Sequence, residues 1–369
     1  MAKTQETVLE IDLTKLKHNY DFIKSQVNSN TKIIAVVKAF AYGSDAENIA
    51  TYLQELNVDY FAVAYVNEGI ALRKAGVHKP IIVLHPQQIN FNLLIDHCLE
   101  PNLYNFNVLN EFIKTTSALK QRNYPIHIKF NTGLNRLGFT PEDTAKVIKL
   151  TNASNSIQVN SVCSHLAASE DSNEREFTLQ QIATFKTIQS VFKAQSNYTP
   201  LYHLVNTSGI LNYPEAHFDM VRTGIGLYGF GNSEQHDKHL QPIASLKSVI
   251  SQIHHIKAGE SLGYNRAFIA QKNTTTATIP IGHADGITRQ YGNGKGVVYI
   301  NNQKATIIGN VCMDMIMVDI TSINCVEGDE VVIYNGKHTA TDLAATGHSI
   351  SYEIITATSQ RIKRVFISK

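Results

Sequence analysis

A lysine ends a run of apolar residues near the amino terminus of this 369-residue chain, where the sequence reads KIIAVVKAFAYG. Burying a lysine costs hydration and rotamer entropy, so Lys38 at the end of a buried strand needs a chemical reason. Lysine condenses with aldehydes to form Schiff bases. Small and hydroxyl residues at Thr207–Ser208 and Gly224–Gly226 can expose backbone N–H groups to a phosphate. The pair of features predicts an aldehyde that carries a phosphate. Pyridoxal phosphate (PLP) and the substrate of a sugar-phosphate aldolase both fit this description.

Alternating strand-like and helix-like segments must position these residues. Candidate strands cover residues 32–39, 59–65, 80–85, 101–106, 125–131, 156–165, 200–206 and 217–229. Helical patterns cover residues 46–56, 66–76, 108–120, 141–152 and 173–194, with a weaker one at 87–98. Eight such units predict an α/β fold, a (β/α)8 barrel of the TIM type, whose active site lies at the carboxyl ends of the strands. An open doubly wound sheet is the alternative, but no GxGxxG motif follows the first strand.

The pattern changes after Gly231. A polar stretch at 232–242 is typical of a linker, and most later segments have the composition of strands. The sequence YINNQKATII predicts a hairpin that turns at Asn301 and Asn302. We therefore expect the barrel to be followed by a mostly-β second domain.

Further polar residues stand at the ends of the later candidate strands. Lys129 and Arg136 belong to the fifth strand and its loop, His165 ends the sixth, Asn206 ends the seventh and Arg222 lies on the eighth. Each of them alone has an ordinary structural explanation. Because a barrel brings the carboxyl ends of its strands to one mouth, we expect them to converge on one site.

Composition excludes several classes of function. The formal net charge is +2 without a long Lys/Arg run, which disfavours nucleic acid as a partner. Neither a signal sequence nor an apolar stretch of about 18 residues is present, so we expect no membrane association. The four cysteines lie far apart without metal-ligand spacing, which predicts no metal and favours a reducing, cytoplasmic compartment.

Nine motifs, in order along nearly the whole chain, resemble those of the alanine racemase family. They are VVKAFAYGSD, KFNTGLNRLGF, CSHLAAS, HLVNTSGI, VRTGIGLYG, GYNRAF, GHADG, GNVCMDMIMVD and SYEI. The resemblance implies a PLP-binding barrel at 14–233 and a β domain formed by 1–13 with 234–369. It also implies a homodimer with two shared active sites.

Carried over to this sequence, the resemblance implies that Lys38 holds PLP and is one of two catalytic bases. The second base is Tyr264, supplied by the partner chain. Arg222 is implied to face the pyridine nitrogen with His165 beside it. The other implied cofactor contacts are Tyr42, Asn206, Thr207, Gly224, Ile225 and Tyr352.

The resemblance also implies the substrate contacts and the reaction. Arg136 and the backbone N–H of the partner's Met313 hold the substrate carboxylate, and Lys129 matches a lysine that is often carbamylated. The implied reaction interconverts L-alanine and D-alanine and supplies D-alanine for peptidoglycan. Differences from the family at His283 and Asn310 leave open a racemase of broader specificity, for serine or lysine.

Two further alternatives remain. A PLP-barrel decarboxylase would place an acidic residue against the pyridine nitrogen, where this chain has Arg222. A non-enzymatic PLP carrier would have a single domain.

Overall fold

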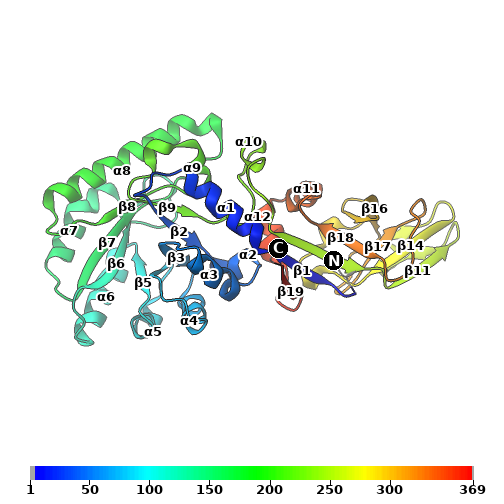
Figure 1. Cartoon of the computed structure of the whole chain (residues 1–369), viewed down its shortest axis with the longest axis horizontal. Coiled ribbons are helices and arrows are strands. Elements are labelled where there is room, and N and C mark those ends of the chain that lie inside the picture. Colours follow the sequence, from blue (N-terminus) through cyan, green and yellow to red (C-terminus); the bar gives the residue numbers. More distant parts are fainter. Residues whose placement is uncertain (1–4, 368–369) are drawn as a thin grey trace. The chain divides into compact units, whose positions relative to one another are not determined.

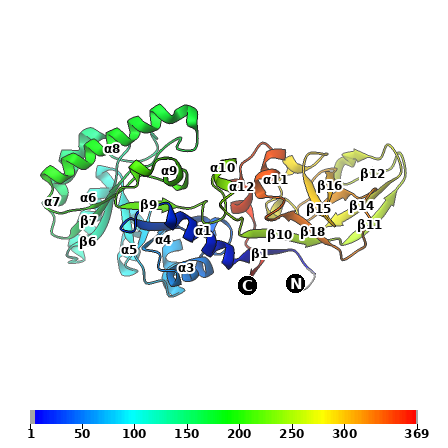
Figure 2. The ribbon, with the colours of Figure 1, turned by 45° about the horizontal axis from the view of Figure 1, so that its top comes forward.

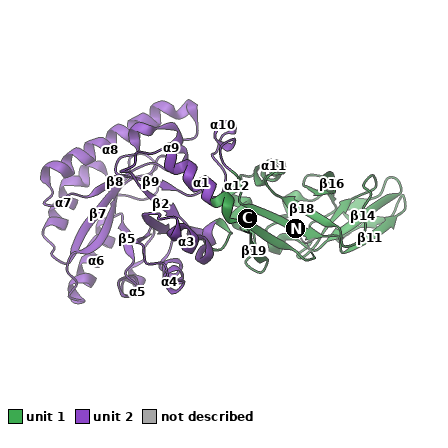
Figure 3. Cartoon of the chain, viewed as in Figure 1, with its two compact units in different colours: residues 1–16, 42–45, 241–369 green, residues 17–41, 46–240 purple. Residues whose placement is uncertain are grey.

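The computed structural model describes residues 5–367 and divides into two compact units. The first unit contains residues 1–16, 42–45 and 241–369, and the second contains residues 17–41 and 46–240 (Figure 3).

The second unit is a closed barrel of eight parallel strands. In order around the barrel, they are β2(Lys32–Val36), β3(Tyr60–Val63), β4(Ile81–Val83), β5(Glu100–Leu103), β6(Tyr124–Lys129), β7(Ile157–Cys163), β8(Leu201–His203) and β9(Met220–Thr223). Pairing of β2 with β9, where Lys32 lies opposite Met220 and Ile34 opposite Arg222, closes the barrel. The predicted barrel is confirmed, with strands shorter than expected because each one ends where its residues begin to build the mouth.

Helices cover the outside of this barrel. They are α1(Leu13–Ser25), α3(Ala46–Glu55), α4(Val66–Lys74), α5(Phe91–Asp96), α6(Phe106–Ala118), α7(Thr144–Asn152), α8(Arg175–Gln195) and α9(Thr207–Asn212). Helix α3 shows why they pack there, since its buried residues Ala46, Ile49, Ala50 and Leu53 recur at the helical period. The long helix α8 lies beside α7 on the outside of the strands in both views (Figures 1 and 2). No helix among residues 5–367 is long and apolar enough to cross a membrane.

The first unit is built on a nine-stranded sheet with the order β11-β14-β17-β16-β15-β18-β10-β1-β19. Its strands are β1(Val8–Asp12), β10(Ala244–Val249), β11(Gln252–Ile256), β14(Thr274–Ile279), β15(Val297–Ile300), β16(Gln303–Ile308), β17(Ile316–Asp319), β18(Glu330–Tyr334) and β19(Lys363–Ile367). The expected mostly-β domain is thereby confirmed. The amino-terminal strand β1 pairs antiparallel with β10 and parallel with β19.

Two local features of this unit depend on residue type. The hairpin between β15 and β16 turns at Asn301 and Asn302, as predicted, with φ of 50° and 62°. Asparagine tolerates this left-handed conformation better than most residues. Two helices that were not predicted, α11(Ala340–Thr346) and α12(Ser351–Ala357), follow β18 in this unit.

Candidate functional site

Lys38 directly follows the first barrel strand and begins a turn with unusual backbone conformation. Ala39, Phe40 and Ala41 have φ of 52°, 56° and 50°, and Tyr42 has φ of 53°. Four consecutive left-handed residues without a glycine cost roughly 1–2 kcal/mol each. Such strain persists only where the surrounding structure imposes it, and it concentrates at functional sites. The strained turn that follows Lys38 is therefore a feature expected of a functional site.

The Glu68 carboxylate supports this turn. Its Oε1 accepts a hydrogen bond from the Ala39 N–H at 2.6 Å, while Oε2 accepts from the N–H groups of Ala64 and Tyr65 at 2.7 and 3.0 Å. Glu68 thus caps α4 and also anchors the residue that follows Lys38. Sequence reasoning missed Glu68 because its position in a helical pattern is equally typical of a solvated surface residue.

Gly43 ends the left-handed turn, with φ of 85°. A Cβ at this position would lie 2.1 Å from the carbonyl oxygen of Ile355 on α12. The Arg364 side chain also donates a hydrogen bond from Nη2 to the Gly43 carbonyl oxygen at 2.8 Å. Both the backbone conformation and the close approach therefore require glycine.

The charges of three other basic side chains act on Lys129, the last residue of β6. Burial lowers the pKa of Lys129; Cys163 opposes this effect, while the charges of Arg222, Arg136 and Lys38 lower the pKa further. Burial also lowers the pKa of Lys38, with Arg136 acting in the same direction and Glu68 opposing. The structure thus brings together the four basic residues predicted at the strand ends. Concentrated positive charge of this kind favours an anionic ligand.

The Arg222 guanidinium lies buried inside the barrel among hydrogen-bond acceptors. Its Nη2 donates to the carbonyl oxygens of Ser164 and Leu204 at 2.8 and 2.7 Å and to His165 Nδ1 at 3.0 Å. Its Nη1 donates to His203 Nδ1 at 2.6 Å. Nε makes no hydrogen bond to any residue in the described part of the chain and stays available to a ligand.

Both histidines that accept from Arg222 are neutral. Burial and the adjacent Arg222 charge hold the pKa of His165 and the pKa of His203 well below their usual range. Since arginine can only donate, each imidazole must present an unprotonated Nδ1 and carry its proton on Nε2. The contact between His165 and Arg222 was expected. His203 was not proposed as a site residue, because a histidine on an apolar strand is more often a satisfied core residue.

Thr207 and the backbone after β9 form a small cradle of polar groups. The N–H groups of Gly224 and Gly226 both donate to Thr207 Oγ1 at 3.3 Å. A Cβ at Gly226 would lie 2.7 Å from the Thr207 side chain, so only glycine allows this approach. Asn206 fixes the start of α9 by accepting from the Gly209 N–H at 2.9 Å. Two backbone donors and a hydroxyl that can reorient are groups that bind phosphate.

In the first unit, Tyr42 lies against Tyr352 of α12, with ring centroids 6.1 Å apart. Burial raises the pKa of Tyr42, with the Tyr352 phenol acting in the same direction, so its hydroxyl stays protonated and can donate. Sequence reasoning proposed these two tyrosines as partners of one phosphate, and the structure brings them together.

Tyr264 and Met313 are exposed on the first unit, by 73% and 60%. The backbone after Tyr264 is strained, with φ of 59° at Asn265 and 48° at Arg266. Asn310 holds the turn by donating from Nδ2 to the Tyr264 carbonyl oxygen at 3.1 Å. Asn310, which departs from the family pattern, thus supports the proposed second base.

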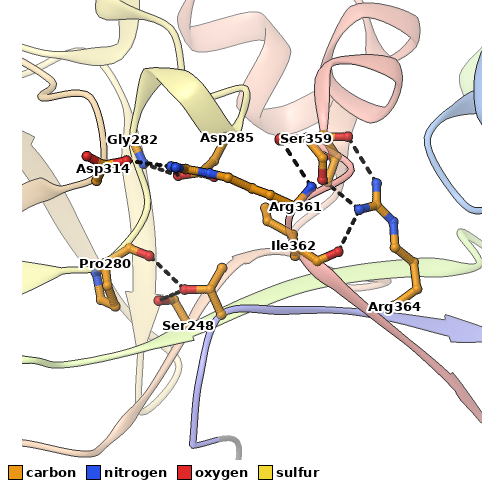
Figure 4. Close-up of polar contacts among 11 residues, drawn as sticks. Ser248, Pro280, Gly282, Asp285, Asp314, Ser359, Arg361, Ile362 and Arg364 are labelled. Carbon is orange, nitrogen blue, oxygen red and sulfur yellow. Dashed lines mark hydrogen bonds and ion pairs between the residues drawn. The ribbon is translucent and has the colours of Figure 1, made fainter.

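An arginine ties together two loops of the first unit (Figure 4). Arg361 binds Asp285 at 2.6 and 2.9 Å and Asp314 at 2.6 Å. Asp285 also accepts from the Gly282 N–H at 3.0 Å. Since Asp314 directly follows Met313, this network fixes the loop whose backbone N–H was proposed to bind a carboxylate. Sequence reasoning did not single out Arg361, whose flanking residues show no distinctive motif.

No group of three or more His, Cys, Asp and Glu side chains in residues 5–367 has the arrangement of a metal site.

Comparison with known proteins identifies matches along nearly the entire chain. Residues 11–231 match the family model "Alanine racemase, N-terminal domain", and residues 243–366 match "Alanine racemase, C-terminal domain". Alanine racemase 1 of Clostridium acetobutylicum is 35% identical over 371 residues, which span 97% of this chain and 94% of that protein.

Solved structures show the same similarity. Alanine racemase of Clostridium difficile 630 is 31% identical with a TM-score of 0.92, covering 99% of this chain and 97% of that one. Alanine racemase of Bartonella henselae, whose structure contains covalently bound pyridoxal phosphate, is 29% identical with a TM-score of 0.89. That match covers 99% of this chain and all of the other.

Proposed function

The chain belongs to the alanine racemase family, and on that premise we propose that it interconverts L-alanine and D-alanine with PLP as its cofactor. The observation that carries the proposal is the buried Arg222 guanidinium. It has two neutral histidines on its Nη groups and leaves its Nε–H available.

The residues present fit this cofactor. Burial lowers the pKa of Lys38, which increases the share of neutral amine that can condense with an aldehyde. Thr207 with the N–H groups of Gly224 and Gly226 suits the phosphate. Ile225, Asn206, Tyr42 and Tyr352 complete the proposed set of cofactor contacts. When bound, PLP would supply a ring that withdraws electrons from the substrate Cα.

Arg222 is proposed to face the pyridine nitrogen through Nε. Burial lowers the pKa of Arg222, but arginine starts from a pKa above ~12 and therefore does not transfer a proton to the pyridine nitrogen. Arg222 therefore leaves that nitrogen unprotonated and limits how strongly the ring draws electrons. This disfavours protonation of the cofactor and transamination, and it favours return of the proton to Cα.

Racemisation requires a proton to leave one face of Cα and to return on the other. We propose Lys38 as the base on one face and the partner subunit's Tyr264 as the base on the opposite face. Arg136 and the N–H of the partner subunit's Met313 would hold the substrate carboxylate. Two fixed bases allow inversion without rotation of the substrate.

Lys129 is proposed to be carbamylated. Its lowered pKa increases the share of neutral amine, which would form an N–C bond to carbon dioxide and lose a proton. The resulting carbamate would place a negative charge among Arg136, Arg222 and Lys38 and so help to hold Arg136 in place.

A homodimer with shared sites accounts for the exposure of the proposed groups on the β unit. Tyr264, Met313, Met315 and Ile269 are all large and exposed there, and exposed apolar groups of this size mark an interaction surface. We further propose a cytoplasmic location, supported by four free thiols, and a role in supplying D-alanine for peptidoglycan.

The test is incubation of the PLP-loaded protein with pure L-alanine, followed by chiral chromatography. Enantiomers have equal free energies, so we expect equal amounts of L-alanine and D-alanine at equilibrium. Parallel incubations with L-serine and L-lysine measure specificity. Conversion of serine or lysine at a higher rate than alanine would favour the broader racemase, and release of carbon dioxide would favour a decarboxylase.

A further inference from the structure

A continuous chain of buried polar side chains runs through the barrel beneath Arg222. It starts at Glu100 on β5 and passes through His127 on β6, Ser161 on β7 and His203 on β8 to Arg222 on β9. Five neighbouring strands contribute one residue each. All five residues are at least nine-tenths buried.

The distances along this chain are those of hydrogen bonds. They are 2.8 Å from Glu100 Oε2 to His127 Nε2, 2.6 Å from His127 Nδ1 to Ser161 Oγ, 2.9 Å from Ser161 Oγ to His203 Nε2 and 2.6 Å from His203 Nδ1 to Arg222 Nη1. The register of the strands explains why these residues are hydrogen-bonded in this order. His127 lies directly opposite Ser161 in the β6–β7 pair, and Cys163 lies opposite His203 in the β7–β8 pair, so inward-facing residues stack across neighbouring strands.

The two ends of the chain fix the direction of every hydrogen bond in it. Arg222 can only donate, so His203 accepts at Nδ1 and carries its proton on Nε2. That Nε2–H donates to Ser161 Oγ, whose hydroxyl donates to His127 Nδ1. His127 then donates from Nε2 to the Oε2 of Glu100, at the other end of the chain. Reversing His203 would set its Nδ1–H against the Arg222 N–H, and reversing His127 would set an unprotonated Nε2 against the Glu100 carboxyl oxygen.

The chain also explains how a buried cation is tolerated. Buried charges are normally paired, yet no carboxylate in residues 5–367 forms a direct ion pair with Arg222. Instead, the hydrogen-bonded side chains of His127, Ser161 and His203 connect the Glu100 carboxyl group to Arg222.

We propose that Glu100, His127, Ser161 and His203 are positioning residues for the reaction, which fix the tautomer of His203 and thereby the orientation of the Arg222 guanidinium. The proposal rests on the proposed function, in which Arg222 Nε faces the pyridine nitrogen. None of the four residues needs to touch substrate or cofactor. Loss of the chain would leave the binding groups in place and misdirect Arg222.

Ser161→Ala removes the middle of the chain, and Ser156→Ala is the matched control. Ser156 precedes the same strand and is also buried, bonded to Thr116 Oγ1 at 2.8 Å, but it belongs to a separate network. We expect similar losses of thermal stability in both variants. Only Ser161→Ala should lower kcat for alanine racemisation, by about 10- to 100-fold, with KM changed by less than about twofold. Ser161→Thr, which restores a hydroxyl, should recover most of kcat.

A second readout does not depend on activity. Nitrogen-15 NMR of histidine-labelled full-length protein, with and without PLP, reports which ring nitrogen carries the proton. We expect Nε2–H tautomers at His127 and His203 in the unsubstituted protein, and loss of the uniform Nε2–H state of His203 in Ser161→Ala.

A proton on Nδ1 of His203 in the unsubstituted protein would overturn the proposal without any variant having to fold. A kcat for Ser161→Ala within twofold of that for Ser156→Ala would overturn it as well. Failure of the unsubstituted protein to racemise alanine would instead refute the proposed function, while the NMR result would still decide whether the chain has the stated direction.

Discussion

Replacing Gly43 with alanine should destabilise the protein far more than the same change at Gly328. The two glycines have almost the same φ, 85° and 84°. Alanine in this left-handed region costs roughly 1–2 kcal/mol at either position. A Cβ at Gly43 would lie 2.1 Å from the Ile355 carbonyl oxygen, whereas a Cβ at Gly328 meets no atom within 4 Å. Gly328→Ala therefore measures the backbone strain alone.

The overlap at Gly43 should add a further cost. A carbon and a carbonyl oxygen ordinarily approach to about 3.3 Å, so the backbone of Ile355 or Gly43 must move by about 1 Å. Because a backbone carbonyl cannot rotate away as a side chain can, we expect the upper end of the usual overpacking penalty, about 3 kcal/mol. For a unit of this size, that corresponds to a Tm about 6–12 °C below that of Gly328→Ala.

Differential scanning calorimetry of the two variants at one scan rate measures this difference. Titration with PLP gives a second comparison, because Gly43 ends the left-handed turn that starts at Lys38. Gly43→Ala should bind PLP more weakly, and Gly328→Ala should bind it as the unsubstituted protein does. Equal Tm shifts, within about 2 °C, together with equal PLP affinities would refute the reasoning about the close approach.

Three further predictions concern the proposed site. Lys38→Ala should abolish the visible absorbance of lysine-bound PLP and its fixation by borohydride; retention of either would refute Lys38 as the attachment point. Arg136→Gln should raise the pKa of Lys38 by removing a repelling charge, which leaves less neutral amine at a given pH. The pH at which added PLP reaches half its final absorbance should then move upward, and a downward shift would contradict this sign. Mixing inactive Lys38→Ala with inactive Tyr264→Phe under subunit exchange should restore activity, because one site of each mixed dimer carries neither change. If mass spectrometry shows exchange without recovery, the site is not shared between chains.

The barrel and the hairpin could be predicted from sequence because local pattern determines them. Parallel strands buried on both faces appear as short apolar runs such as Ile33–Val37, and their alternation with helical patterns is specific to few folds. The turn at Asn301–Asn302 was predictable because few residue pairs tolerate left-handed φ at both positions.

The left-handed turn at Lys38–Tyr42 could not be predicted, since Ala, Phe and Tyr have no local preference for positive φ. Tertiary contacts impose it, among them the hydrogen bond from Ala39 to Glu68. The short helices α9, α11 and α12 were missed for the same reason, because helices of six or seven residues depend on their surroundings more than on propensity.

Some site residues could likewise be predicted from local sequence, whereas others depend on tertiary contacts. Four site residues were proposed from their places at strand ends and from the family motifs: Lys38, Lys129, His165 and Arg222. In the structure they lie close enough for their charges to shift one another's pKa. His203 could not be linked to Arg222 without knowing the strand register, which sequence pattern does not specify to the residue.

Exchange of the Cα proton with deuterated water, followed separately from L-alanine and from D-alanine, tests the two-base site most directly. The family resemblance assigns Tyr264 to the L-enantiomer and Lys38 to the D-enantiomer. In Tyr264→Phe, loss of the Cα proton from L-alanine should therefore slow much more than loss from D-alanine, while PLP binding to Lys38 is retained. Equal slowing for both enantiomers, or no slowing for either, would contradict a site in which Lys38 and the partner subunit's Tyr264 act on opposite faces of the substrate.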